Sequence, residues 1–264
     1  MSQLDQYVEQ MLDEKMEPIE LFYQPIYECY NCNHVAYRAT TQVNSLIYGV
    51  LTPDEYAEAS DMAKQGIGLM LASVEKAMRV VNQFRRSHRR YVEWVSVLCP
   101  TAALLTPDIY ARLKELIDDQ KFRQPNKICL EFGEDVLRLR SEQVYTALRD
   151  IKATGFKVAV RNCGTGDFSL ADLLTFTPDV VFMNDEFIGL INDRDHAAAV
   201  PAMIRYVKAL GIAVIAEGIK DDDMLREMNK IECFGFIPSL DYGGKFPCAK
   251  AFVKRSEITS HKEE

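Results

Sequence analysis

The residues with the clearest chemical potential stand where a short apolar run meets a polar turn. Residues 158–160 are small or β-branched, and Arg161, Asn162 and the Gly-Thr-Gly turn at 164–166 follow them closely. In α/β proteins with parallel sheets, functional groups gather at such strand ends, and metal-dependent enzymes place acidic ligands there. A guanidinium cannot bind a cation, and a neutral amide binds one poorly. This segment therefore predicts an enzyme-like scaffold without metal ligands at this strand end.

The ends of the other predicted strands carry few acidic groups. In chain order these positions are residues 38–42 (from Arg38 to Gln42), Leu98, Glu131, Phe182, Asn184 and Glu217. The carboxylates among them are Glu131 and Glu217. An unpaired charge in a concave site is costly, so we expect Arg38 and Arg161 to lie within ion-pair distance of these two carboxylates.

Strand and helix patterns alternate along most of the chain. Residues 21–27 and 34–41 are predicted strands, and the turn at 29–33 is too short for a helical crossover, so they form an antiparallel hairpin. Further strands, with helices between them, are predicted at 91–98, 127–132, 156–160, 179–183, 212–216 and 232–237. Such alternation implies a parallel sheet, and about eight strands favour a modified TIM-like (β/α)8 barrel with an antiparallel N-terminal strand pair. A doubly wound open sheet is the alternative.

The predicted domain organisation is one barrel with two short extensions. Residues 1–18 have helical spacing, residues 19–255 form the barrel domain, and residues 256–264 form a polar, flexible tail.

Composition limits the partners and the compartment. The net charge of −8 argues against direct binding to nucleic acid or to an anionic membrane. No apolar run reaches the roughly 18 residues of a transmembrane helix, and the N-terminus lacks a signal-peptide pattern. The 7 cysteines are odd in number and scattered, which is typical of reduced thiols. These features predict a cytoplasmic protein.

Two cysteines have the spacing of half a zinc site. Cys29 and Cys32 are separated by two residues, but structural zinc takes about four ligands and no second pair of this kind follows. Turn thiols without a metal are the favoured interpretation.

Four short segments resemble signatures of one protein family. They are Phe22-Tyr23-Gln24-Pro25-Ile26 ("YQP" in the family), Leu130-Glu131-Phe132-Gly133-Glu134 ("LEITE"), Gly164-Thr165-Gly166 with Ser169-Leu170 ("GTGxSSL") and Ile215-Ala216-Glu217-Gly218-Ile219 ("IAEGV"). In this order and spacing, residues from about 20 to 246 resemble the EAL domain, the barrel that hydrolyses the bacterial second messenger cyclic di-GMP. The chain resembles a degenerate, standalone member of that family.

The resemblance also shows where the chain departs from the family. In the family, certain positions hold metal ligands, phosphate-binding groups and water-orienting groups. Here those positions hold Arg38, Gln42, Arg161, Asn162, Phe182 and Asn184. One further position, on the third strand, is Leu98 or, if the match to the family is shifted by two residues, Ser96. Two-metal hydrolysis needs two divalent ions about 4 Å apart, held mainly by carboxylates. Glu131 and Glu217 are too few for this, so the departures predict no metal, no cofactor and no enzymatic activity.

The resemblance leaves several functions open. The favoured one is a regulatory module in bacterial signalling that binds another protein. The alternative is a cyclic di-GMP receptor that does not hydrolyse its ligand. Its remnant pocket would comprise Gln24, Arg38, Gln42, Glu131, Arg161, Asn162, Asn184 and Glu217. A weak phosphodiesterase and an unrelated barrel enzyme are less favoured.

The segment after the Gly-Thr-Gly turn is a predicted interface. It carries Phe168 and Leu170, together with Leu173 and Leu174, which follow a helical stripe. Phe168 lies outside that stripe, and an exposed aromatic residue can anchor an interface. The resemblance implies a homodimer through this region. A Phe168 side chain that caps the barrel is an equally favoured alternative.

Overall fold

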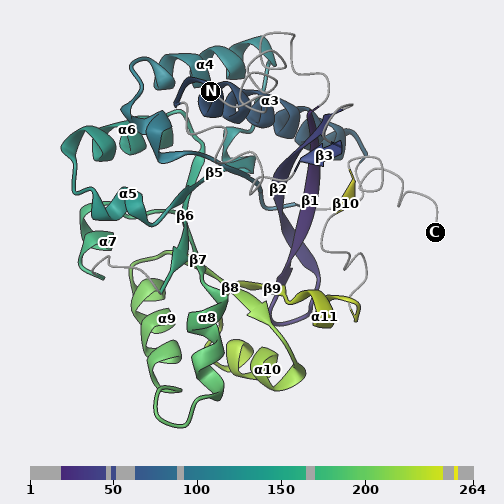
Figure 1. Cartoon of the computed structure of the whole chain (residues 1–264), viewed down its shortest axis with the longest axis vertical. Helices are drawn as coiled ribbons and strands as arrows, with labels where there is room; N and C mark the ends of the chain where they lie inside the picture. Colours follow the sequence, from purple (N-terminus) through teal and green to yellow (C-terminus); the bar gives the residue numbers. More distant parts are fainter. Residues whose placement is uncertain are drawn as a thin grey trace.

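A closed ring of strands forms the centre of the molecule (Figure 1). The computed structural model describes residues 19–45, 49–51, 63–87, 92–164, 170–245 and 253–254. In order, the ring strands are β1 (Ile19–Glu28), β2 (His34–Ser45), β4 (Val95–Leu98), β5 (Ile128–Gly133), β6 (Lys157–Cys163), β7 (Val180–Met183), β8 (Ala213–Ile219) and β9 (Gly235–Pro238). Outside it, β3 (Gly49–Leu51) pairs with β2 and β10 (Val253–Lys254) with β1. The barrel predicted from the sequence is confirmed.

The strand β1 is the exception to the parallel order of the ring. It runs antiparallel to β2 and to β9, whereas the other neighbouring ring strands pair in parallel. The β1–β2 hairpin is confirmed, because its short turn leaves no room for a crossover helix. Because β1 also pairs with β9, one antiparallel strand closes the barrel.

Helices follow most of the parallel strands and cover the outside of the ring (Figure 1). They are α3 (Ala63–Ser87), α4 (Ile109–Asp119), α5 (Asp135–Arg138), α6 (Glu142–Ala153), α7 (Asp172–Thr175), α8 (Asp185–Gly189), α9 (Ala199–Ala209), α10 (Asp222–Lys230) and α11 (Leu240–Gly243). The helix predicted from about residue 169 is only the short α7 within the described chain. No described helix is long and apolar enough to cross a membrane.

The buried residues form two layers because side chains alternate along each strand. The larger layer lies between the strands and the helices. The smaller layer consists of Ile26, Ala36, Trp94, Cys129, Ala159, Val180, Phe182, Ile215 and Ile237. These nine come from the ring strands or the residues next to them, and they fill the interior as in other small barrels. Polar side chains that face the barrel interior lie beyond this apolar layer, toward the carboxyl ends of the parallel strands.

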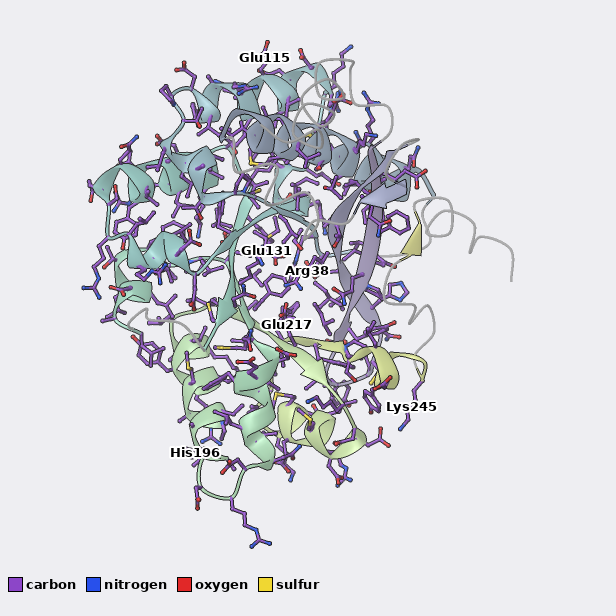
Figure 2. The ribbon with its side chains drawn as sticks, viewed as in Figure 1. Arg38, Glu115, Glu131, His196, Glu217 and Lys245 are labelled. Carbon is purple, nitrogen blue, oxygen red and sulfur yellow. The ribbon has the colours of Figure 1, made fainter. Side chains whose placement is uncertain are left out.

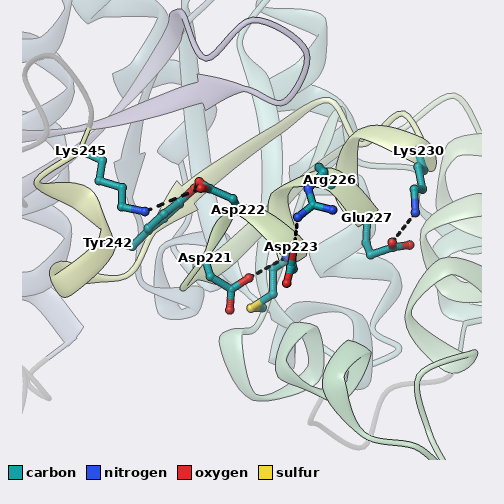
Figure 3. A network of polar contacts seen from close by, with 9 residues as sticks. Asp221, Asp222, Asp223, Arg226, Glu227, Lys230, Tyr242 and Lys245 are labelled. Atoms are coloured by element: carbon teal, nitrogen blue, oxygen red, sulfur yellow. Dashed lines mark hydrogen bonds and ion pairs between the residues drawn. The ribbon is translucent and has the colours of Figure 1, made fainter.

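The helix α10 is fixed at its start and tied to α11 (Figure 3). The Asp221 carboxylate accepts a hydrogen bond of 2.8 Å from the Met224 N–H, which caps the helix. The Tyr242 hydroxyl of α11 donates to Asp222, and Lys245 lies 3.8 Å from the same carboxylate. Because α10 follows β8 and α11 follows β9, these contacts hold the ends of two neighbouring strands together.

Three predictions fall outside the described residues. They are the helix at 1–18, the tail at 256–264 and the side chain of Phe168.

Candidate ligand site at the barrel mouth

Arg38 lies between two carboxylates at the carboxyl ends of the parallel strands (Figure 2). Its Nε donates to Glu131 Oε2 at 3.1 Å, and its Nη2 lies 2.8 Å from Glu131 Oε1. The same Nη2 forms an ion pair with Glu217. The first contact has hydrogen-bond geometry, whereas the Nη2 contacts are close ion pairs without that alignment. The predicted pairing of Arg38 with Glu131 or Glu217 is confirmed.

Neighbouring strands fix the Arg38 side chain. Arg38 stands opposite Gln24 of β1 and level with Ser96 of β4. The Ser96 hydroxyl donates to Glu131 Oε2 at 2.9 Å, and the Glu131 side chain is completely buried. The guanidinium carbon lies 4.2 Å from the centre of the Phe182 ring, a cation–π contact. The cation is thus held by charge, hydrogen bonds and an aromatic face.

The end of β8 requires a glycine beside Glu217. Gly218 has a φ of 75°, and a Cβ atom there would lie 2.4 Å from Asp185 Cβ of α8. An L-residue would meet both the left-handed backbone and this contact. The glycine of the "AEG" segment therefore lets α8 pack against β8 next to the Glu217 carboxylate.

The surroundings of Arg38 stabilise its charged form, and they disfavour the ionised form of a second carboxyl group beside it. Burial opposes the charge of Arg38, but Glu131 and Glu217 outweigh it and raise its pKa. Burial raises the pKa of Glu217, Arg38 acts in the opposite direction, and Glu131 adds to the rise. One cation faces two carboxylates, so Glu217 carries the less compensated charge.

Arg161 does not join this cluster, contrary to the prediction. Arg161, Glu131 and Glu217 are all described, and no ion pair joins Arg161 to either carboxylate. Strand register explains the difference: Ala159 is level with Glu131, and Arg161 lies two residues farther toward the mouth, about 7 Å along β6. Its Nε is buried without a hydrogen-bond partner in the described part of the chain.

Asn162 stands apart from the Arg38 cluster. It is exposed, has a φ of 62° and lies where the β6–β7 register shifts between Val160 and Cys163. Asparagine tolerates this left-handed conformation better than most residues, so the position is explained by the bulge. A run of β-branched residues predicted the strand but contained no sign of this bulge.

The other predicted pocket residues have separate surroundings. Asn184 caps α8, because its side-chain oxygen accepts a hydrogen bond of 2.7 Å from Glu186 N–H. Gln42 lies four residues beyond Arg38 on β2, about 13 Å along the strand. Gln24, by contrast, is the cross-strand neighbour of Arg38.

The sequence left open whether Leu98 or Ser96 occupies the site position on the third strand of the ring. The structure places the Ser96 hydroxyl on Glu131, which makes Ser96 the polar group of β4 at the site. Leu98 is level with Glu131 in the backbone register. The signal that points to Ser96 is its parallel pairing with Arg38, which a single sequence does not reveal.

The arrangement does not fit a divalent ion held by Glu131 and Glu217. The Arg38 guanidinium contacts both carboxylates, and a second cation there would meet its charge. In the described part of the chain, no group of three His, Cys, Asp or Glu side chains has a metal-holding arrangement. Cys29, one of the two cysteines with the spacing of half a zinc site, has its pKa raised by a hydrogen bond with Cys233 and by burial.

Comparison with known proteins gives the family. The family model of the EAL domain matches residues 8–236. One relative, "Probable cyclic di-GMP phosphodiesterase PdeI" of Escherichia coli, is 24% identical over 131 residues, which are 48% of this chain and 16% of that protein. An uncharacterized protein of Azorhizobium caulinodans is 22% identical over 93% of this chain and 35% of its own length. The chain thus spans only a minor part of these curated relatives.

Two solved structures share the fold. The EAL enzyme Bd1971, with cAMP and cyclic di-GMP bound, superposes with a TM-score of 0.82 at 19% identity over 98% of this chain and 69% of that chain. The PaMucR phosphodiesterase in complex with cyclic di-GMP gives a TM-score of 0.80 at 18% identity over 91% and 96%. At this identity the likeness shows the fold alone.

These findings contradict the prediction that the chain is not an enzyme. The family model is that of the EAL domain, and the matching Escherichia coli relative is named as a probable cyclic di-GMP phosphodiesterase, so the family points to an enzyme. The prediction relied on residue replacements at strand ends, and replacement of some ligands does not by itself exclude hydrolysis. With the family model matching most of its length, the chain belongs to the EAL domain family.

Proposed function

We propose that the chain binds cyclic di-GMP at the barrel mouth and works as a regulatory EAL domain in bacterial signalling. The observation that carries the proposal is the buried Arg161 Nε, which has no hydrogen-bond partner among the described residues. A buried N–H group without a partner is stabilised when a ligand supplies a hydrogen-bond acceptor. Guanidinium–phosphate hydrogen bonds are among the strongest in proteins. Arg38 supplies a second guanidinium toward the same end of the barrel.

The ion pairs of Arg38 suggest how a phosphodiester could enter. Glu131 is completely buried and bonded to Ser96, so it stays with Arg38. Glu217 is more exposed, at 17%, and burial raises its pKa, so its ion pair is the easier one to give up. A ligand phosphate can replace the Glu217 carboxylate on Arg38 without leaving the guanidinium uncompensated.

Calorimetric titration with cyclic di-GMP, with and without Mg²⁺, tests the proposal. We expect a dissociation constant below about 10 μM, or roughly −7 kcal/mol. Arg161→Gln should weaken binding about tenfold or more, since a hydrogen bond to a charged group contributes about 1.5–3 kcal/mol. Arg149→Gln is the control, because Arg149 pairs with the exposed Glu142. No saturable heat, or equal binding by the Arg161→Gln variant, would contradict the proposal.

Hydrolysis is measured in the same samples. Chromatography of the titrated nucleotide shows whether a linear product forms and whether it depends on Mg²⁺. If wild type forms the linear product and Glu131→Ala does not, hydrolysis of the bound ligand takes place at the barrel mouth.

Binding of another protein is the second candidate function. It is favoured by Leu174 of α7 and Leu240 of α11, whose side chains are exposed to 62% and 76%. Single exposed leucines are common on soluble proteins, and an exposed apolar side chain can also contact a protein partner.

A further inference from the structure

A cavity lies at the end of the barrel opposite the mouth. It has a volume of about 410 Å³. Its lining includes Trp94, Lys157, Asp179, Ala213 and Phe234, which begin or directly precede the parallel strands β4, β6, β7, β8 and β9. Parallel strands start at one end of a barrel, so this cavity, the lower pocket, is separated from Arg38 by the interior apolar cluster.

Two aromatic rings line the pocket and belong to the interior cluster. Trp94 and Phe234 stack with centroids 5.4 Å apart and an angle of 28° between their planes. Trp94 is 3% exposed, and its Nε1 is buried without a hydrogen-bond partner among the described residues. The pocket therefore has stacked aromatic rings on one side, and the Trp94 indole N–H is covered and does not face the cavity.

The two lysines of the pocket differ in their partners. Lys152 Nζ lies 3.1 Å from Asp179 Oδ1 and donates to the Thr177 carbonyl at 3.0 Å. Asp179 Oδ2 also accepts from Val158 N–H at 2.8 Å, so this group is satisfied internally. These contacts leave little capacity for a ligand on that side.

Lys157 provides the available charge. Its Nζ lies 5.8 Å from the centre of the Trp94 ring, and no described carboxylate forms an ion pair with it. Glu93 also lines the pocket and pairs with neither lysine in the described structure. Among the described lining residues, one lysine without an ion pair and one separate carboxylate favour a ligand of low charge over a polyanion such as a nucleotide.

We propose that the lower pocket binds a small aromatic monocarboxylate. The ring of the ligand would lie against Trp94 and Phe234, and its carboxylate would pair with Lys157. The cavity volume falls within the range of about 300–1,000 Å³ that is usual for small-molecule sites. The inference is independent of the function proposed for the mouth, because the two sites share no residue.

The single tryptophan of the chain makes a direct test feasible. The sequence contains a single tryptophan, Trp94, so the tryptophan fluorescence of the full chain reports on this pocket. Titration with phenylacetate should change the emission saturably. Lys157→Gln should weaken binding about tenfold, as expected for loss of a charge-assisted contact, while Lys157→Arg should retain it. The neutral analogue phenylacetamide should bind wild type about tenfold more weakly than phenylacetate does.

Lys208→Gln is the matched control. Lys208 bonds the Ile231 carbonyl and Glu232, and it does not line the pocket. Circular dichroism of each variant separates loss of binding from loss of the fold, and Lys157→Arg keeps the test valid if the Gln variant unfolds. An emission that does not saturate with phenylacetate, equal binding of phenylacetamide, or unchanged binding in a folded Lys157→Gln variant would each overturn the proposal.

Discussion

Arg38 is the residue that organises the barrel mouth. It provides the positive charge between two carboxylates, and its guanidinium is also stacked on Phe182. A buried ion pair contributes little net stability against an apolar alternative, but loss of one partner leaves a costly unpaired charge. The cluster therefore behaves as a unit, and its members are best tested by single substitutions that keep side-chain length.

Arg38→Met should destabilise the fold in a pH-dependent way. The methionine can pack against the Phe182 ring in place of the guanidinium, but it leaves Glu131, which is completely buried, and Glu217 without a cation. We expect a loss of about 3 kcal/mol in the free energy of unfolding at pH 7, and a smaller loss near pH 5, where one carboxylate can take up a proton. Urea denaturation at the two pH values measures it.

Arg149→Met serves as the control for Arg38→Met. Arg149 and its partner Glu142 are exposed to 51% and 77%, so this ion pair should contribute less than about 1 kcal/mol. Equal stability of wild type and Arg38→Met at pH 7 would show that the mouth does not depend on the buried cation.

Glu217→Gln should flatten the dependence of stability on pH. Burial raises the folded-state pKa of Glu217 above its ordinary value of 4.5. A carboxyl with a raised folded pKa contributes stability that is fully present below the unfolded value and is lost as pH rises through the folded value. Stability should therefore fall less in the Gln variant than in wild type between pH 4.5 and pH 7. Urea unfolding across this range, with the exposed Glu142→Gln as control, checks the sign; a steeper fall in the Gln variant would contradict it.

At the scale of elements, the β8–α8 contact sets the position of Glu217. Gly218→Ala should cost at least about 2 kcal/mol and weaken any ligand binding at the mouth, because the new methyl group would lie 2.4 Å from Asp185 Cβ. Gly211→Ala is a close control. Gly211 has a similar φ of 77°, but a methyl group there would have nothing within 4 Å, so this variant carries only the backbone cost of about 1 kcal/mol. Thermal and urea unfolding of both variants give the difference, and equal losses would mean that α8 moves aside freely.

At the scale of the whole molecule, the sequence predicted the ring but not its local irregularities. Hairpin length predicted the antiparallel β1–β2 pair, whereas strand–helix alternation favoured the barrel but left a doubly wound open sheet as the alternative. The pairing of Arg38 with Glu131 and Glu217 followed from their positions at predicted strand ends together with charge balance. The place of Arg161 depends instead on the parallel register of β5 and β6, which apolar periodicity does not fix.

The exposed side chains were also only partly predictable. A stripe of Leu170, Leu173 and Leu174 was expected to face the strands. In the structure Leu173 is buried and Leu170 packs partly against the core, but Leu174 is 62% exposed. The reason is that α7 spans only Asp172–Thr175, about one turn, so Leu170 lies before the helix and the i, i+3, i+4 spacing does not place the three leucines on one helical face.

Self-association through the segment from Phe168 to Leu174 is the last prediction. The sequence predicts a homodimer here, and Leu174 is an exposed apolar residue in the described part of this segment. Sedimentation at tens of micromolar should give a dimer for wild type. Phe168→Ala should shift it to monomer because it removes the aromatic anchor, and Leu174→Glu because a buried charge without a partner opposes association. Leu240→Glu is the control, since Leu240 is exposed to 76% on α11. A monomeric wild type would defeat the prediction, and a dimer that survives Leu174→Glu but not Leu240→Glu would place the interface on α11.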